Sequence, residues 1–124
     1  MKFEKYYITD NKENSNCVIR TISKLFNEDY EEVENKLLEI ANKLNKNYND
    51  IEVFERVLFD NGYYEIKTSE VQIKELKLDS SKYAILCYDK NNYYHMVAVI
   101  NNILYDRTDE SLDLYALKIY KQEW

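Results

Sequence analysis

Cys17 is the residue of this chain best placed for nucleophilic chemistry, and it follows a polar, Asn-rich segment. From Cys17 onward, apolar residues recur at the spacing of one buried helix face: Val18, Ile19, Ile22, Leu25 and Phe26. We therefore predict a helix over residues 17–26, with Cys17 on its first turn. Unpaired backbone N–H groups and the helix dipole favour an anion there, which shifts a thiol toward the nucleophilic thiolate. Cys17 is a candidate nucleophile, and the alternative is an unreactive cysteine that fills space.

The base that such a nucleophile needs has one candidate, because His95 is the only histidine in the chain. Residues 93–108 predict a β-hairpin with Asn101 and Asn102 in a two-residue turn. That register places Asp106 diagonally across from His95 on the same face, about 7–8 Å away at the backbone. The side chains then come within hydrogen-bonding reach, so we predict that Asp106 orients the imidazole.

A cysteine that opens the first long helix, a later histidine on a strand and an acid on the following strand resemble the papain-like cysteine peptidases. Within that group, the chain resembles the small bacterial and phage-borne C39-like peptidase domains. The resemblance is carried by NCVIRTISKLFNEDYEEV and HMVAVINNILYDRTDES and covers roughly residues 11–35 and 83–111. It implies a papain-like fold and a catalytic triad of Cys17, His95 and Asp106.

The resemblance also implies an oxyanion hole, to which papain-like enzymes contribute a side-chain amide six residues before the nucleophile. The matching residue is Asn11, where the family usually has Gln. Because Asn is shorter, Asn14 and Asn16 stay candidates beside it. The backbone N–H of Cys17 is the expected second donor.

Aromatic and basic residues near the predicted site are candidates for substrate contact. Tyr93 and Tyr94 directly precede the histidine, and tyrosine rings supply contact area at low entropy cost. The alternative is that both are ordinary sheet residues. Arg20 and Arg107 are the arginines near the site, where each either binds a substrate carboxylate or forms an ordinary salt bridge.

The elements that must position these residues follow from periodicity and capping signals. A second helix is predicted after Asp29, and a third is predicted from about residue 50 to the Asn61–Gly62 pair. Strand-like runs cover residues 82–88, 93–100, 103–108 and 112–120, with shorter extended segments at 3–9 and 63–68. The run at 112–120 also fits a helix. Residues 70–78 fit either a brief helix or an irregular connection. We therefore predict an α+β fold in which N-terminal helices pack on an antiparallel β-sheet.

Composition restricts the function classes further. The 124 residues are expected to form one domain, residues 1–124, with 45% hydrophobic and 32% charged residues. A net charge of −6 argues against general affinity for nucleic acid or an anionic membrane. The N-terminal segment has no apolar signal core and no run is long enough to span a membrane, so we expect the protein in the cytoplasm, with reduced thiols. Cys87 lies within a strand-like run and is predicted to be a core residue.

These parts predict a cysteine hydrolase that cleaves a peptide or isopeptide amide in a peptide or protein substrate. Two alternatives use the same scaffold differently. In the first, the protein is an acyltransferase, because an amine excludes water from the acyl-enzyme. In the second, the protein is a small, acidic, phage-borne inhibitor that binds a host protein partner and does not use the triad. No cofactor or metal is expected, since the chain has one glycine and no CxxC, HxxxH, GxxxxGK[ST] or GxGxxG pattern.

Overall fold

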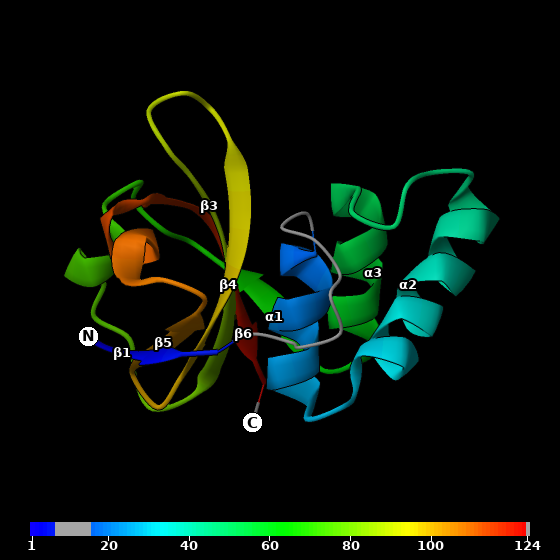
Figure 1. The fold of residues 1–124 in the computed structure, drawn as a ribbon, viewed down its shortest axis with the longest axis horizontal. Helices are drawn as coiled ribbons and strands as arrows, with labels where there is room; N and C mark the ends of the chain where they lie inside the picture. The colour runs from blue at the N-terminus through cyan, green and yellow to red at the C-terminus, as the bar shows by residue number, and fades with distance from the viewer. Residues whose placement is uncertain (7–15, 124) are drawn as a thin grey trace.

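The computed structural model describes residues 1–6 and 16–123. Its helices are α1 (Cys17–Phe26), α2 (Tyr30–Leu44) and α3 (Ile51–Asp60). Its strands are β1 (Lys2–Lys5), β2 (Tyr63–Ile66), β3 (Lys82–Tyr88), β4 (Tyr94–Ile100), β5 (Ile103–Asp106) and β6 (Tyr115–Gln122). Two short 3-10 helices are η1 (Ile73–Glu75) and η2 (Asp109–Asp113). The fold is α+β as predicted, with α1 packed on β4 and α2 packed against both α1 and α3 (Figure 1).

The six-stranded sheet is mixed, so the prediction of a purely antiparallel sheet is wrong. The strand order is β1-β5-β4-β3-β6-β2, and β1 runs parallel to β5 while the other neighbouring pairs are antiparallel. A parallel pair needs a long crossover, which the helices and strands between β1 and β5 supply. The last pair of β1 joins Lys5 to Asp106. The first strand therefore ends beside the predicted orienting acid.

The second and third helices begin at their predicted caps. The Asp29 carboxylate accepts a hydrogen bond from the Glu32 N–H at 2.9 Å, and the Glu32 side chain accepts one from the Asp29 N–H, which completes a capping box. The Asp50 carboxylate caps α3 by accepting from the Glu52 N–H at 2.9 Å. Gly62, just beyond α3, has a φ of 86°, a left-handed conformation that glycine adopts without strain.

The hairpin of β4 and β5 has the predicted register. Asn101 and Asn102 have φ values of 52° and 61°, and a type I′ turn requires both to be positive. The ladder pairs Ile100 with Ile103, Val99 with Leu104, and Ala98 with Tyr105. The strand predicted to reach residue 108 ends at Asp106, where the Arg107 N–H turns back to bond the Asp106 carboxylate. The strand predicted at 112–120 likewise starts later, at Tyr115, because η2 occupies the residues before it.

Hydrophobic clusters cover both faces of the sheet. The helix-side cluster joins α1 to β4 and includes Ile19, Ile22, Leu25, Met96 and Ala98. The opposite cluster includes Ile73, Ile85, Val97, Val99, Leu104 and Ile119. Fully burying one such side chain contributes about 1.5–3 kcal/mol. The middle of β4 is therefore packed from both sides and forms a rigid support for His95 near its start. Within residues 1–6 and 16–123, no helix has the length and apolar character needed to cross a membrane.

Candidate active site

Cys17 is the first residue of α1, as predicted, and its side chain is half-buried against the helix-side core. The His95 side chain and the backbone of Met96 lie close enough to the thiol for each to lower its pKa. Burial raises the pKa of Cys17, but the hydrogen bond and charge of His95, the Met96 contact and the charge of Arg20 bring the pKa below its ordinary value. The thiol is therefore biased toward thiolate, the reactive form.

His95 uses both of its ring nitrogens. Nε2 lies 2.8 Å from Asp106 Oδ2, which leaves Nδ1 for the hydrogen bond to Cys17. Burial lowers the pKa of His95, yet the hydrogen bonds and charges of Asp106 and Cys17 raise it to about 9. Near neutral pH the ring therefore carries a positive charge and pairs with the Asp106 carboxylate.

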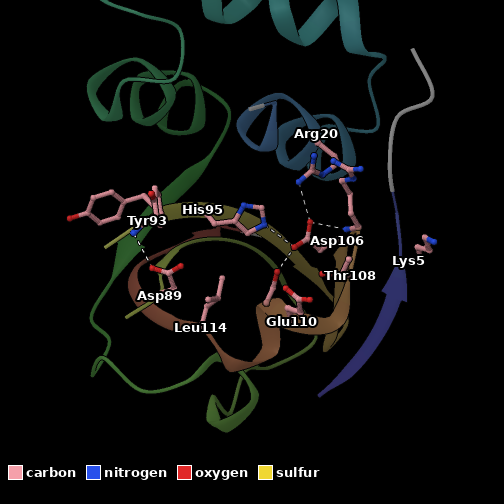
Figure 2. A pocket seen from close by; sticks show the side chains of 12 residues that line it. Lys5, Arg20, Asp89, Tyr93, His95, Asp106, Thr108, Glu110 and Leu114 are labelled. Atoms are coloured by element: carbon pink, nitrogen blue, oxygen red, sulfur yellow. Dashed lines mark hydrogen bonds and ion pairs between the residues drawn. The ribbon is translucent and has the colours of Figure 1, made fainter. Parts of the chain in front are cut away.

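Asp106 is a buried carboxylate, 4% exposed, with hydrogen-bond donors on both oxygens (Figure 2). Oδ2 accepts from His95 and from the hydroxyl of Ser111. Oδ1 accepts from the Arg107 N–H at 2.8 Å and from Arg20 Nη2 at 3.1 Å. Burial raises the pKa of Asp106, but the contacts with His95, Ser111 and the Arg107 N–H hold it below its usual range. The predicted His95–Asp106 hydrogen bond is present.

The side chains of Arg20 and Ser111 also contact Asp106, and the sequence alone did not predict either contact. Arg20 lies one helical turn after Cys17, so its place on the same helix face follows from spacing. Its partner, however, is 86 residues away, and the structure settles its role as a salt bridge to Asp106. Ser111 belongs to η2, and no pattern in the sequence marks it.

The start of α1 differs from the start of the other helices. Asn16 is the residue before the helix, but its side chain makes no capping bond. Its Oδ1 instead accepts from Arg20 Nη1 at 2.8 Å. The first-turn N–H groups, including that of Cys17, therefore have no acceptor in the Asn16 side chain. Of the other oxyanion candidates, Asn11 and Asn14 lie outside the described residues.

A buried hydroxyl connects α1 to the strand that carries the histidine. Thr21 Oγ1 donates to the carbonyl of Met96 at 2.9 Å, and Thr21 is 3% exposed. Met96 also contacts the Cys17 thiol through its backbone. The distance between the helix start and β4 is therefore fixed by polar contacts as well as by packing.

A pocket of about 640 Å³ opens beside the His95–Asp106 pair (Figure 2). The residues that line it are Lys5, Arg20, Asp89, Tyr93, Tyr94, His95, Asp106, Arg107, Thr108, Glu110, Ser111 and Leu114. Tyr93 and Tyr94, the predicted substrate-binding residues, are 71% and 64% exposed at its rim. Among the described residues the pocket borders His95 but not Cys17, so it lies on the histidine side of the thiol.

Cys87 is unsuited to nucleophilic chemistry, as predicted. It is fully buried in β3, and its thiol donates to the His95 carbonyl at 3.3 Å. Burial raises the pKa of Cys87 well above its ordinary value, and the charges of Asp106 and Cys17 act in the same direction. Within the part of the chain that the structure describes, no group of three His, Cys, Asp or Glu residues is arranged to hold a metal ion.

The arrangement can generate a nucleophile, move a proton and hold the imidazole in one orientation. The thiol is on a helix start, one imidazole nitrogen contacts it, and the other contacts a buried carboxylate. This is the order of contacts that nucleophilic acyl chemistry requires. No protein-family model, curated protein or solved structure matches the chain.

Proposed function

We propose that the protein is a papain-like cysteine hydrolase that cleaves a peptide or isopeptide amide. The observation that carries the proposal is the continuous contact from Cys17 through His95 to Asp106. The three residues come from α1, β4 and β5, which the two hydrophobic clusters hold together. A nucleophile, a base and an orienting acid in this order are the parts of a catalytic triad.

In the first step, the Cys17 thiolate attacks the substrate carbonyl carbon, and the carbonyl oxygen takes the negative charge. The Cys17 backbone N–H, on a first turn that the Asn16 side chain does not cap, is suited to stabilise that oxyanion. The imidazolium of His95 then gives its Nδ1 proton to the leaving nitrogen as the C–N bond breaks. A thioester on Cys17 and a free amine result.

In the second step, neutral His95 takes a proton from water, and the resulting hydroxide attacks the thioester. The carboxylic acid leaves, and the thiolate–imidazolium pair is restored. Asp106 keeps Nδ1 directed at the reacting atoms by holding Nε2 throughout. An amine that excluded water would take the acyl group instead, which is the acyltransferase outcome.

The pocket is placed to receive the leaving part of the substrate. The leaving nitrogen takes its proton from His95, and the pocket borders His95 on the side of Tyr93, Thr108 and Leu114. A volume of about 640 Å³ lies within the range of ligand sites, about 300–1,000 Å³. Side chains that follow the scissile amide of a peptide are the chemistry that fits there.

The direct test uses wild-type protein, Cys17→Ala and the matched variant Cys87→Ala. Each is incubated with a diverse peptide library, and new termini are read by mass spectrometry. We expect cleavage by wild type and Cys87→Ala and none by Cys17→Ala. A pull-down from the same three proteins separates the alternatives, because a thioester-linked species requires Cys17. Absence of cleavage, combined with equal stable capture of a partner by wild type and Cys17→Ala, contradicts the hydrolase and favours the inhibitor.

A further inference from the structure

Arg20 is a buried side chain that contacts both the residue preceding the nucleophile and the triad acid. It is 4% exposed, donates from Nη1 to Asn16 Oδ1 at 2.8 Å and donates from Nη2 to Asp106 Oδ1 at 3.1 Å. Its backbone N–H also donates to the Asn16 carbonyl at 2.9 Å. Figure 2 shows Arg20 reaching from α1 toward Asp106. One guanidinium thus joins the two ends of the site.

The contact with Asp106 matters because the carboxylate is buried. When His95 gives up its proton, Asp106 would face a neutral ring, and an uncompensated buried charge costs several kcal/mol. Arg20 is always protonated and stays paired with Asp106 through that step. The histidine can therefore change its charge without leaving the carboxylate unpaired.

The contact with Asn16 matters because it engages a potential helix cap. In α2 and α3 an aspartate side chain accepts a first-turn N–H, whereas the Asn16 oxygen of α1 is held by Arg20. A capped first turn has a donor fewer for a thiolate or an oxyanion. Arg20 therefore keeps the Asn16 oxygen away from the N–H groups beside Cys17.

We propose that Arg20 is a positioning residue that sets the reactivity of Cys17, by pairing with Asp106 and by holding Asn16 off the start of α1. The proposal rests on the proposed function for its catalytic meaning, although its effect on the thiol is measurable without a substrate. Both contacts favour the thiolate. Losing Arg20 removes a nearby positive charge and frees Asn16 to cap, and each change raises the Cys17 pKa.

The other groups around the thiol must be held constant in any test. Several charged or titratable groups contact Cys17 or the partners of Arg20. They are His95 on β4, Asp106 on β5, Cys87 on β3, Arg20 on α1 and Arg107 after β5. None of these is changed when a cation elsewhere on α1 is removed. Lys24 supplies that control, because its ammonium lies over the rings of Tyr6 and Tyr105 at 5.1 Å and 4.3 Å.

The experiment measures the rate of Cys17 alkylation by iodoacetamide from pH 4 to 10, for wild type, Arg20→Gln and Lys24→Gln. Thermal unfolding of each protein confirms that it is folded. We expect Arg20→Gln to move the midpoint of the profile upward by about half a pH unit or more. Lys24→Gln should leave the midpoint in place. A folded Arg20→Gln protein with the wild-type midpoint overturns the proposal.

Arg20→Lys keeps the test decisive if Arg20→Gln does not fold. Lysine retains the charge but ends in one ammonium group, so it cannot hold Asn16 and Asp106 in the fork geometry of arginine. We expect a smaller upward shift of the same midpoint, and a profile that superimposes on wild type contradicts the role. The two proposals fail separately. A wild-type Cys17 that titrates like a free thiol contradicts the hydrolase. A lowered wild-type midpoint that does not change in the Arg20 variants contradicts only the positioning role.

Discussion

Cys17 and Cys87 both contact His95, and their thiols are shifted in opposite directions. Cys17 bonds the His95 ring and its pKa is lowered, whereas Cys87 donates to the His95 carbonyl at 3.3 Å and its pKa is raised. The difference is one of position. Cys17 lies on a helix start beside a cation, and Cys87 lies in the apolar interior of the sheet.

Iodoacetamide at pH 6 should therefore modify Cys17 far faster than Cys87. Peptide mass spectrometry of the native protein measures both rates in one sample. His95→Ala should remove most of the advantage of Cys17, because an exposed helix dipole alone contributes only about 0.3–1 kcal/mol. If the His95→Ala protein reacts at the wild-type rate, the thiolate–imidazolium pair is not present in the resting protein.

The His95–Asp106 hydrogen bond predicts the behaviour of Asp106→Asn. Without the carboxylate charge, the pKa of His95 should fall from about 9 toward its ordinary value, since Asp106 is one of the groups that raise it. Titration of the ring protons by NMR measures the shift. Hydrolysis should fall by about 10²–10⁴-fold, as expected when an orienting acid is lost. An unchanged His95 pKa in Asp106→Asn would contradict this geometry.

In wild type, hydrolysis should also decline above about pH 9, where His95 no longer has a proton to donate.

Acid should destabilise the protein partly through Asp106. Its pKa in the folded state is below the ordinary value of 3.8, so the folded state binds fewer protons than the unfolded state. The resulting stability is present above the unfolded pKa and is lost as pH falls through the folded one. Urea unfolding should therefore show the free-energy gap between wild type and Asp106→Asn narrowing as pH falls from 6 to 3.

Because the tyrosine rings at the pocket rim are exposed, we expect their removal to weaken substrate binding rather than to slow the chemical step. Tyr93 is 71% exposed and lines the pocket without contacting the triad hydrogen bonds. With any peptide that the wild type cleaves, Tyr93→Ala should raise KM several-fold and leave kcat little changed, because an interaction equal in ground and transition states is lost. Tyr64→Ala is a matched control, since Tyr64 is 42% exposed on β2. A kcat defect in Tyr93→Ala would place that ring nearer the chemistry.

Local patterns in the sequence were sufficient for the parts of the fold that depend on neighbours in the chain. The bounds of α1, the caps of α2 and α3, and the turn at Asn101 and Asn102 each follow from residues within one or two turns of one another. The same turn placed Asp106 on the face of His95.

Contacts between distant segments were not predictable in this way. The parallel pairing of β1 with β5 joins strands about a hundred residues apart. The four residues of β1 contain no pattern that indicates which strand they pair with. The two partners of Arg20 likewise combine a contact four residues away with one 86 residues away. Asn16 has a good capping side chain, and its local preference is overridden because the buried guanidinium needs an acceptor.

The place of β6 in the sheet bears on when the protein becomes reactive during synthesis. β6 follows every site residue in sequence, yet it lies inside the sheet, between β3 and β2. A nascent chain can form α1 early, but β3, which pairs with the strand that carries His95, lacks its other neighbour until β6 has left the ribosome. Assembly of the nucleophile with its base therefore depends on the synthesis of β6. A growing chain would expose a thiol of ordinary reactivity, and the activated one would arise only in the finished sheet.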